Sequence, residues 1–252
     1  MIQIQIQIII KNQIMKILEK TIITVGNNME YFSISYKGDI REKNEDYYKN
    51  ETFKDSQIFL IADGMGGCKY GEKASEIAVE EFLICFKNHY DEKLSMKDLI
   101  YGSIHHAGYK ILDFSKSNNC LNNIGTTFLA TIIKENTMYL FNIGDSRAYL
   151  QNEYGFYQIS KDHIVKNNEN LKNAITRGLG FLSMDKPDYI IKELNADDQI
   201  LMATDGFYKF IDNSSIEYIL KSNLNVKEKC NTLLENVTNK SDDNITITLI
   251  KI

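Results

Sequence analysis

Apolar residues gather in short runs along the chain, and most of these runs have the length and composition of buried strands. Between them lie longer segments in which apolar residues recur every three or four positions, as in amphipathic helices. The predicted strands cover 30–36, 57–62, 126–133, 138–150, 189–194, 199–204 and 245–252. The predicted helices cover 72–89, a segment from Ser95 onward with a capping-box arrangement, 214–222 and 226–238. Helices in pairs between groups of strands predict an α+β fold, with helices covering a large sheet assembly.

Residues 1–28 form an extension that begins with strict alternation of Ile and Gln. A period of two is typical of a strand, and the segment lacks both the basic start of a signal peptide and the unbroken apolar stretch of a membrane span. Three interpretations are open: an added edge strand, an aggregation-prone tail, or an upstream start with Met15 or Met29 as the real initiator. Beyond Met29 no linker or repeat separates further units, so we predict one domain over 29–252.

The amino-acid composition excludes some classes of function. The 252 residues include 29 Lys and Arg against 34 Asp and Glu, a net charge of −5, with 43% hydrophobic residues, which is typical of a folded domain. An excess of carboxylates argues against a nucleic-acid partner, and we expect no membrane partner either. The cysteines lie far apart without a C-x-x-C pair, at Cys68, Cys85, Cys120 and Cys230. They indicate neither a disulfide framework nor a zinc ribbon, so the simplest location is the reducing cytoplasm.

Carboxylates stand where several apolar strands end. Asp63, Asp145 and Asp205 each close such a run, while Asp242 and Asp243 directly precede the last strand. Taken singly, the Asp-Gly pairs at 63–64 and 205–206 are more typical of hairpin turns. Together the three strand-end carboxylates and the Asp242–Asp243 pair favour a shared site, because carboxylates held close together persist only when protonated, paired with cations or bound to metal. An all-oxygen set without a His/Cys cluster suits Mg²⁺ or Mn²⁺.

Arginine is rare in this chain and marks candidate phosphate contacts. Only three of the 29 basic residues are arginines, and each lies in a glycine-marked segment, at Arg41, Arg147 and Arg177. The planar guanidinium matches phosphate with two parallel hydrogen bonds, so we expect Arg41 to bind phosphate and Arg147 to form a structural ion pair. No cysteine has an arginine six positions downstream, and the glycine-rich segment 64–75 lacks the G-K-[ST] of a nucleotide loop.

Eight segments, in this order, resemble the motifs of the protein phosphatase 2C family, the metal-dependent Ser/Thr phosphatases, in its bacterial type. They are GDIREKNEDYY (38–48), FLIADGMGG (59–67) with GEKAS after it, GTTFLATII (125–133), NIGDSRAYL (142–150), SKDHI (160–164), ITRGLG (175–180), ILMATDGFYKFI (200–211) and DDNITITLI (242–250). The resemblance covers about 29–252. It implies a four-layer αββα sandwich, a central antiparallel β-sandwich flanked by helix pairs, with two metal ions at one end.

By position, the resemblance implies which residues hold these two metals. Asp63 is expected to bridge both ions, and the carbonyl of Gly64 to bind the second. Asp205 and Asp243 are expected to hold the first ion. Asp242 is then a solvated neighbour rather than a ligand.

The resemblance also implies roles around the two metals. Glu45 is expected to act via metal-bound water, as is Asp46, and Arg41 to hold the substrate phosphate. Asp145 with Asp205 is expected to offer a weaker third metal site. In this family a flap of a few dozen residues usually follows the DH motif, whereas here only Ile164–Ala174 precede the RGLG segment, so we expect a shortened flap and weak peptide selectivity.

The expected activity is hydrolysis of phosphoserine and phosphothreonine on proteins by a metal-bridging hydroxide, without a phosphoenzyme. The expected cofactors are two Mn²⁺ or Mg²⁺ ions, with a third held weakly. Phosphorylated proteins, made by an opposing Ser/Thr kinase, are the expected partners. Two alternatives stay open: a catalytically silent binding module with the same fold, and a phosphatase of small molecules or of one dedicated regulator.

Overall fold

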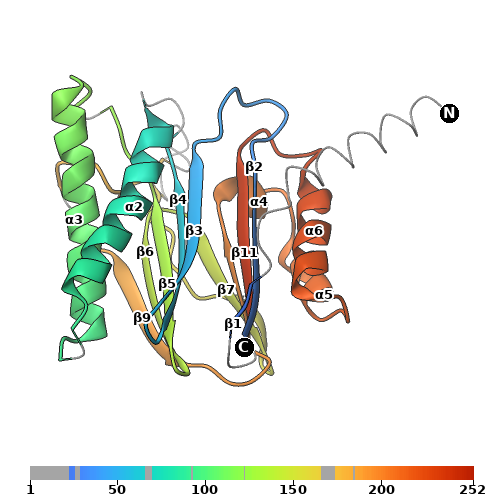
Figure 1. The fold of residues 1–252 in the computed structure, drawn as a ribbon. Coiled ribbons are helices and arrows are strands. Elements are labelled where there is room, and N and C mark those ends of the chain that lie inside the picture. Colours follow the sequence, from blue (N-terminus) through green and yellow to red (C-terminus); the bar gives the residue numbers. More distant parts are fainter. Residues whose placement is uncertain are drawn as a thin grey trace.

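Two antiparallel sheets stacked face to face form the centre of the molecule, and helices cover both outer faces (Figure 1). The computed structural model describes residues 23–25, 29–65, 70–91, 93–121, 123–165, 174–183 and 185–252. Within them, one sheet has six strands in the order β1 (Ile23–Val25), β2 (Met29–Tyr36), β11 (Ile245–Lys251), β10 (Gln199–Ala203), β7 (Arg147–Asn152) and β8 (Gly155–Gln158). The other has five, in the order β3 (Asp46–Phe53), β4 (Ser56–Asp63), β5 (Phe128–Lys134), β6 (Thr137–Ile143) and β9 (Asp188–Glu193).

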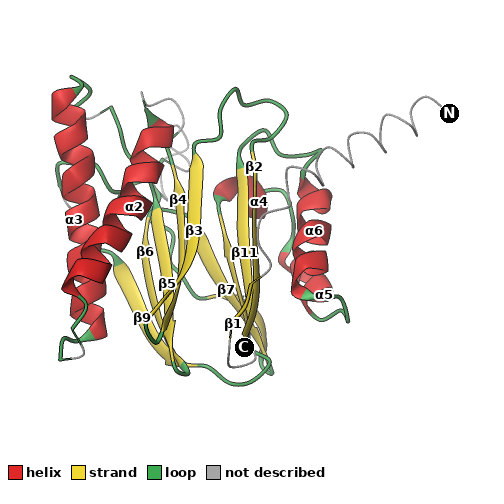
Figure 2. Ribbon diagram, in the orientation of Figure 1, coloured by secondary structure: helices red, strands yellow, loops and turns green. Residues whose placement is uncertain are grey.

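A pair of helices lies on each outer face (Figure 2). The five-stranded sheet is covered by α2 (Gly71–His89) and α3 (Met96–Ser117), and the six-stranded sheet by α5 (Asn213–Leu220) and α6 (Val226–Val237). A single turn, α4 (Asp205–Tyr208), follows β10. This arrangement confirms the predicted α+β class and the four-layer αββα sandwich. None of the described helices is long and apolar enough to span a membrane.

Three apolar clusters hold the four layers together. One lies between the five-stranded sheet and α2 and α3, and contains Phe82, Phe86 and Phe128. A second lies under α5 and α6, and a third fills the space between the two sheets. Burial of this apolar area, at roughly 25 cal/mol per Å², is the main source of stability in such a stack. The predicted strands and helices are those whose apolar residues build these clusters.

The structure corrects three details of the predicted elements. The run 138–150 is two strands, β6 and β7, which belong to different sheets. Strand β3 is not among the predicted strands, because its sequence is largely polar and has no apolar run. Of its residues, only Asp46 is buried. Ser95 stands at the N-cap of α3 without a side-chain capping hydrogen bond, so the capping box is wrong there; Asn225 and Glu228 form one at the start of α6.

Part of the N-terminal extension is described. Ile23–Val25 form β1, an edge strand that pairs antiparallel with Met29–Tyr31 of β2. The alternating Ile/Gln run lies outside the described residues, so the three interpretations of it, and the domain boundary at residue 29, stay predictions.

The interior between the sheets changes from apolar to polar toward one end. Residues of β2 that face the opposite sheet run from Met29 and Tyr31, in the apolar cluster, to Ser33 and Ser35. The two serines hydrogen-bond to Thr248 and Thr246 of β11 at 2.7 and 2.8 Å. Thr246 in turn donates a hydrogen bond to the carboxylate of Asp46. This end of the interior is therefore polar and carries a charged group.

Candidate active site

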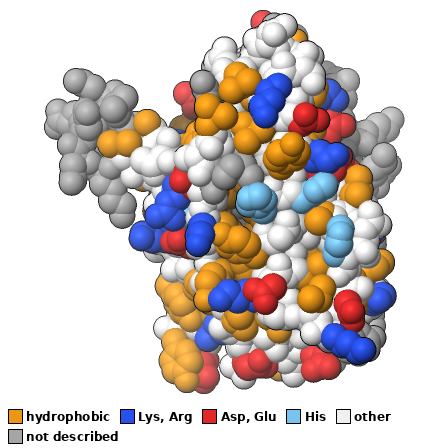
Figure 3. Space-filling view, turned by 90° about the vertical axis from the view of Figure 1, so that its left-hand side faces the viewer, with side chains coloured by type: hydrophobic (Ala, Val, Ile, Leu, Met, Phe, Trp, Pro, Cys, Tyr) orange, Lys and Arg blue, Asp and Glu red, His pale blue; other side chains and the backbone are white. Residues whose placement is uncertain are grey.

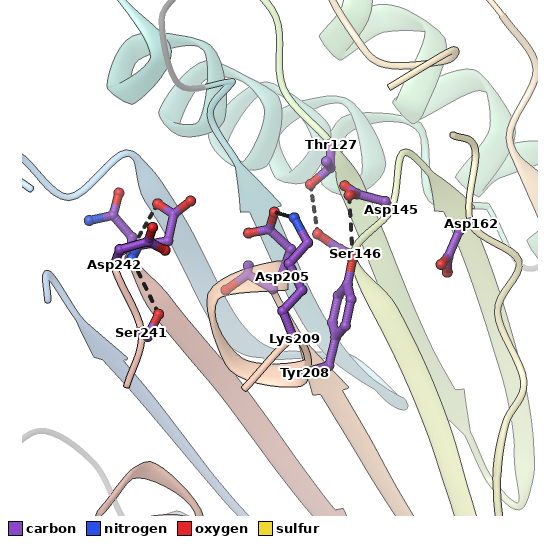
Figure 4. Close-up of polar contacts among 12 residues, drawn as sticks. Thr127, Asp145, Ser146, Asp162, Asp205, Tyr208, Lys209, Ser241 and Asp242 are labelled. Carbon is purple, nitrogen blue, oxygen red and sulfur yellow. Dashed lines mark hydrogen bonds and ion pairs between the residues drawn. The ribbon is translucent and has the colours of Figure 1, made fainter. Parts of the chain in front are cut away.

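Four chain segments bring carboxylates to the polar end of the sandwich. Asp63 ends β4, Asp205 begins α4 directly after β10, and Asp243 precedes β11. Asp145 lies in the turn from β6 to β7, where the chain crosses from one sheet to the other. Figure 4 shows Asp205 between the segment of Asp242 on one side and Asp145 on the other. The tertiary fold therefore gathers the strand-end carboxylates that the sequence singled out.

The backbone of Asp63 is held by two threonines of the GTT segment. Its N–H donates to Oγ1 of Thr127 at 3.0 Å, and its carbonyl accepts from the Thr127 N–H at 2.9 Å and from Oγ1 of Thr126 at 2.8 Å. The Thr127 hydroxyl also hydrogen-bonds to Oγ of Ser146 at 2.8 Å, the residue after Asp145. Asp63 and the Asp145 turn are thus tied to one rigid support, which sequence reasoning missed.

Asp46 and Asp63 face each other as register partners at the ends of β3 and β4. Oδ2 of Asp46 accepts hydrogen bonds from the hydroxyls of Thr204 at 2.9 Å and Thr246 at 2.7 Å. Burial raises the pKa of Asp46 to about 7 despite these bonds, and the charges of Asp205 and Asp243 add to the rise. Removal from water also holds the pKa of Asp63 well above its usual range.

Nearby carboxylates reinforce that shift. Asp46, Asp205, Asp145 and Asp243 all raise the pKa of Asp63 further. Burial and Asp205 likewise raise the pKa of Asp145 to about 6. Like charges held close together out of water favour protonation, and a bound cation would offset their repulsion.

The two Asp-Gly pairs are not hairpin turns, so that alternative is wrong for both. Gly64 forms an isolated bridge with Thr126, and Gly206 lies in the α4 turn. Neither has the positive φ that a type I′ turn requires. A Cβ on Gly64 would lie 2.3 Å from the carbonyl oxygen of Gly71, and one on Gly206 would lie 2.0 Å from that of Asn244. Glycine is needed here for close backbone packing under the carboxylates; the expected use of the Gly64 carbonyl as a ligand stays a prediction.

Two basic side chains reach the cluster. Nη2 of Arg41 donates to Oδ2 of Asp243 at 2.8 Å, and its Nε donates to the carbonyl of Asp242 at 3.3 Å. Lys209, one turn after Asp205, donates from Nζ to Oδ2 of Asp205 at 2.5 Å. The structure therefore places Arg41 at the site, on a carboxylate, and its expected contact with phosphate stays a prediction. Asp242 itself is exposed, as a solvated neighbour would be.

Asn244 organises the β2–β3 connection that carries Arg41 and Glu45. Its buried side chain accepts from the Glu45 N–H at 2.9 Å and donates to the carbonyls of Lys37 at 2.6 Å and Lys43 at 2.9 Å. The carboxylate of Glu45 lies beside the first residue of α2, where a Cβ on Gly71 would come within 2.6 Å of Oε1. Burial raises the pKa of Glu45 as well.

Replacing Asn244 by Ala should lower the free energy of unfolding by about 3 kcal/mol, because a buried side chain loses three hydrogen bonds. Urea denaturation in EDTA measures this. Asn236, exposed on α6 with one hydrogen bond to the Thr232 carbonyl, is the matched control, and its change to Ala should shift stability by no more than about 0.5 kcal/mol. Equal effects of the two changes would mean that Asn244 does not organise the connection.

Arg147 forms an ion pair, as expected, and its partner is Asp162 of the SKDHI segment, at 2.7 Å. The guanidinium also lies 3.7 Å from the centroid of the Tyr208 ring. The Tyr208 hydroxyl in turn donates to Oδ2 of Asp145 at 3.3 Å. Arg147 therefore supports Tyr208 and, through it, Asp145.

The donor set suits hard divalent cations. The side chains that meet here are carboxylates and hydroxyls, the oxygen ligands that Mg²⁺ and Mn²⁺ prefer. Among the described residues, no three Asp, Glu, His or Cys side chains converge closely enough to form a ready coordination sphere. Asp205 and Asp243 are turned to Lys209 and Arg41 instead. The chemistry of the residues fits the expected metals, and cation binding has to compete with these two ion pairs.

The raised carboxyl pKa values predict how stability depends on pH without metal. Asp46 binds its proton more tightly in the folded state than in the unfolded state, where its pKa is near 3.8. The folded state therefore holds more protons between about pH 4 and 7, and this group's contribution to the free energy of unfolding falls as pH rises through that window. Denaturation in EDTA at several pH values, for wild type and Asp46→Asn, isolates the effect. The variant should show the shallower decline; parallel curves would contradict it.

The outer face formed by α2 and α3 is mixed in character. Figure 3 shows blue and red side chains interspersed with apolar ones and histidines, without one gathered basic surface on this side. His106 links the two helices, because its Nε2 lies 3.0 Å from Oε2 of Glu81. This face supports the fold and takes no part in the carboxylate cluster.

Comparison with known proteins agrees with this geometry. The protein phosphatase 2C family model matches residues 40–244. The serine/threonine phosphatase stp of Listeria monocytogenes is 29% identical over 234 residues, covering 85% of this chain and 92% of that protein. The crystal structure of serine/threonine phosphatase Stp1 from Staphylococcus aureus superposes with a TM-score of 0.82 at 26% identity, covering 93% of this chain and 99% of that one.

A further structure shares the fold at lower identity. It is the catalytic domain of the serine/threonine protein phosphatase PstP, solved with two manganese ions, with a TM-score of 0.75 at 24% identity over 88% of this chain and 97% of that one. The family match spans the segments that carry Asp46, Asp63, Asp205 and Asp243. The chain therefore belongs to the protein phosphatase 2C family of metal-dependent serine/threonine phosphatases.

Proposed function

We propose that this protein hydrolyses phosphoserine and phosphothreonine esters on proteins, with two Mn²⁺ or Mg²⁺ ions held at the polar end of the sandwich. Asp63 would contact both ions, Asp205 and Asp243 would hold one of them, and Asp46 and Glu45 would act through water. The observation that carries the proposal is the gathering of Asp46, Asp63, Asp205 and Asp243 at one end of the sandwich. Burial and their mutual charges raise the pKa of Asp63 there, and a bound cation would offset this repulsion. The two manganese ions in the PstP catalytic domain support the number and the kind of metal.

The cations, when bound, make water a nucleophile near neutral pH and neutralise charge on the phosphoryl oxygens. The protein side chains then have three tasks. Thr126 and Thr127 keep Asp63 in place, and Asn244 keeps the Arg41 connection in place. Arg41 would leave Asp243 to hold two oxygens of the substrate phosphate, a contact that suits its planar guanidinium. The leaving alkoxide would take its proton from water.

The connection between the SKDHI and RGLG segments, where the family usually carries a flap, is short. Ile164 and Ile175 form a bridge, and the Val165 N–H donates to the Ala174 carbonyl at 2.9 Å. The two ends are thus paired, and only residues 166–173, outside the described part, lie between them. Fewer side chains border the phosphorylated residue than a longer flap would supply, which supports weak discrimination among phosphoproteins made by an opposing Ser/Thr kinase.

Phosphate release from a phosphothreonine peptide tests the proposal. The full chain and its Asp205→Asn variant, which lacks a proposed metal ligand, are each assayed with Mn²⁺, with Mg²⁺ and with EDTA. Release that depends on metal and is lost in the variant is the expected result. Silence under every condition would favour the binding module. Hydrolysis of small aryl phosphates or phosphometabolites without peptide hydrolysis would favour the small-molecule alternative.

A further inference from the structure

Lys209 places a positive charge inside the carboxylate cluster. Its Nζ lies 2.5 Å from Oδ2 of Asp205, and the side chains of Lys209 and Asp205 are 37% and 18% exposed. The contact is partly exposed, so solvent screens part of the attraction between the two charges. It uses one carboxylate oxygen and leaves Oδ1 of Asp205 for another cation.

The charge of Lys209 acts on more than its nearest partner. The charges of Lys209 and Asp145 also attract each other across this end of the site. Figure 4 shows the side chain rising from the α4 turn and ending at Asp205, on the side of Asp145 and Thr127. The ammonium thus pairs with Asp205 on the side of Asp145, and these are the two carboxylates that the family resemblance implies for a weak third metal.

The α4 turn holds Lys209 in this position. Phe207 is fully buried in the cluster beneath α5 and α6. Tyr208 is fixed by its hydrogen bond to Asp145 and by the guanidinium of Arg147 over its ring. The N–H of Lys209 also donates to the Asp205 carbonyl at 3.2 Å. The backbone on both sides of Lys209 is thus anchored, which keeps the base of its side chain within reach of Asp205.

A divalent cation between Asp145 and Asp205 would meet this ammonium. Like charges within a few ångströms repel even where water screens them in part, so the lysine and a third metal would compete for Asp205. We propose that Lys209 is a built-in cation of the metal centre that takes the place of the third divalent ion, so that the centre holds two metals and a lysine. The inference rests on the proposed function in so far as it requires the cluster to bind metal.

Counting bound Mn²⁺ tests this without reference to turnover. Equilibrium dialysis of the full chain should give about two ions per wild-type chain into the millimolar range, and about three for Lys209→Met, because the variant frees Asp145 and Asp205 for a cation. In EDTA the melting temperature of Lys209→Met should fall by about 3 °C, since Asp205 loses its counter-ion beside Asp145. Lys209→Arg, which keeps the charge, should behave as wild type in both measurements.

Lys221 provides the matched control. It forms the same i, i+4 ion pair with Glu217, at 2.6 Å, on the exposed side of α5. Lys221→Met should leave the Mn²⁺ count unchanged and the melting temperature within about 1 °C of wild type. A third ion on the wild-type chain, or an unchanged count in a folded Lys209→Met, would overturn the inference. Absence of Mn²⁺ from every form would instead contradict the proposed function, so the two failures are distinguishable.

Discussion

Asp63→Asn is expected to abolish phosphatase turnover while leaving the metal-free protein as stable as wild type or more stable. Loss of a ligand that contacts both cations should lower kcat/KM at least about a thousandfold, because the metals supply several kcal/mol to the transition state. Without metal the same change removes a carboxylate that burial and repulsion from its charged neighbours force toward protonation. The amide relieves that repulsion and should raise the melting temperature by about 2–4 °C at neutral pH.

Two measurements check the pair of effects. Steady-state kinetics with Mn²⁺ reports the loss of activity, and thermal unfolding in EDTA reports the stability. Asp242→Asn is the control, since Asp242 is an exposed carboxylate beside the cluster, and it should change neither quantity appreciably. Near-wild-type turnover by Asp63→Asn would refute the metal assignment, and a large loss of metal-free stability would refute the electrostatic account of the cluster.

Arg41→Ala is expected to reduce kcat/KM about a hundredfold without emptying the metal centre, because the guanidinium is assigned to the substrate phosphate. The structure adds a second expectation, since Arg41 pairs with Asp243 at 2.8 Å. Removing the arginine frees that carboxylate, so Mn²⁺ should bind the variant at least as tightly as it binds the wild type. Calorimetric Mn²⁺ titration beside kinetics at saturating Mn²⁺ separates these effects.

Arg41→Lys sharpens the comparison, because it keeps the charge and loses the paired N–H groups. An intermediate activity would indicate that the planar fork itself contributes. If Arg41→Ala instead loses its affinity for Mn²⁺ and recovers normal turnover at saturating metal, Arg41 is a structural partner of Asp243. Its assignment to phosphate would then be wrong.

Much of the site was predictable because its acids stand at the ends of apolar strands. A run such as FLIAD predicts both a buried strand and a carboxylate at the end of that strand. Several such runs together predict that their carboxylates lie at one shared edge. The helix pairs were equally visible, since their apolar stripes at helical spacing build the clusters under α2, α3, α5 and α6. In these elements, the apolar residues that form the pattern in the sequence are the same residues that are buried in the fold.

Strand β3 could not be predicted from the hydrophobic pattern. Strand β3 has no apolar stripe, because one face carries Tyr47 and Lys49 toward Glu80 of α2 and the other carries Asp46 and Asn50 toward polar partners between the sheets. Its strand conformation comes from pairing with β4 along its whole length. A hydrophobic pattern carries no signal for a strand stabilised in this way.

The sequence alone determined which residues bring charge to the ends of strands, and that an all-oxygen set suits hard cations. Only the tertiary structure decided which groups meet there. Thr246 lies 200 positions from the Asp46 that it hydrogen-bonds, and Asn244 lies 201 positions from the Lys43 carbonyl. The pairing of Lys209 with Asp205 is close in sequence, yet its effect on Asp145 depends on where α4 packs. The physical reason is that hydrophobic periodicity reports which face of an element is buried, whereas the partner of a buried polar group is set by how the elements stack.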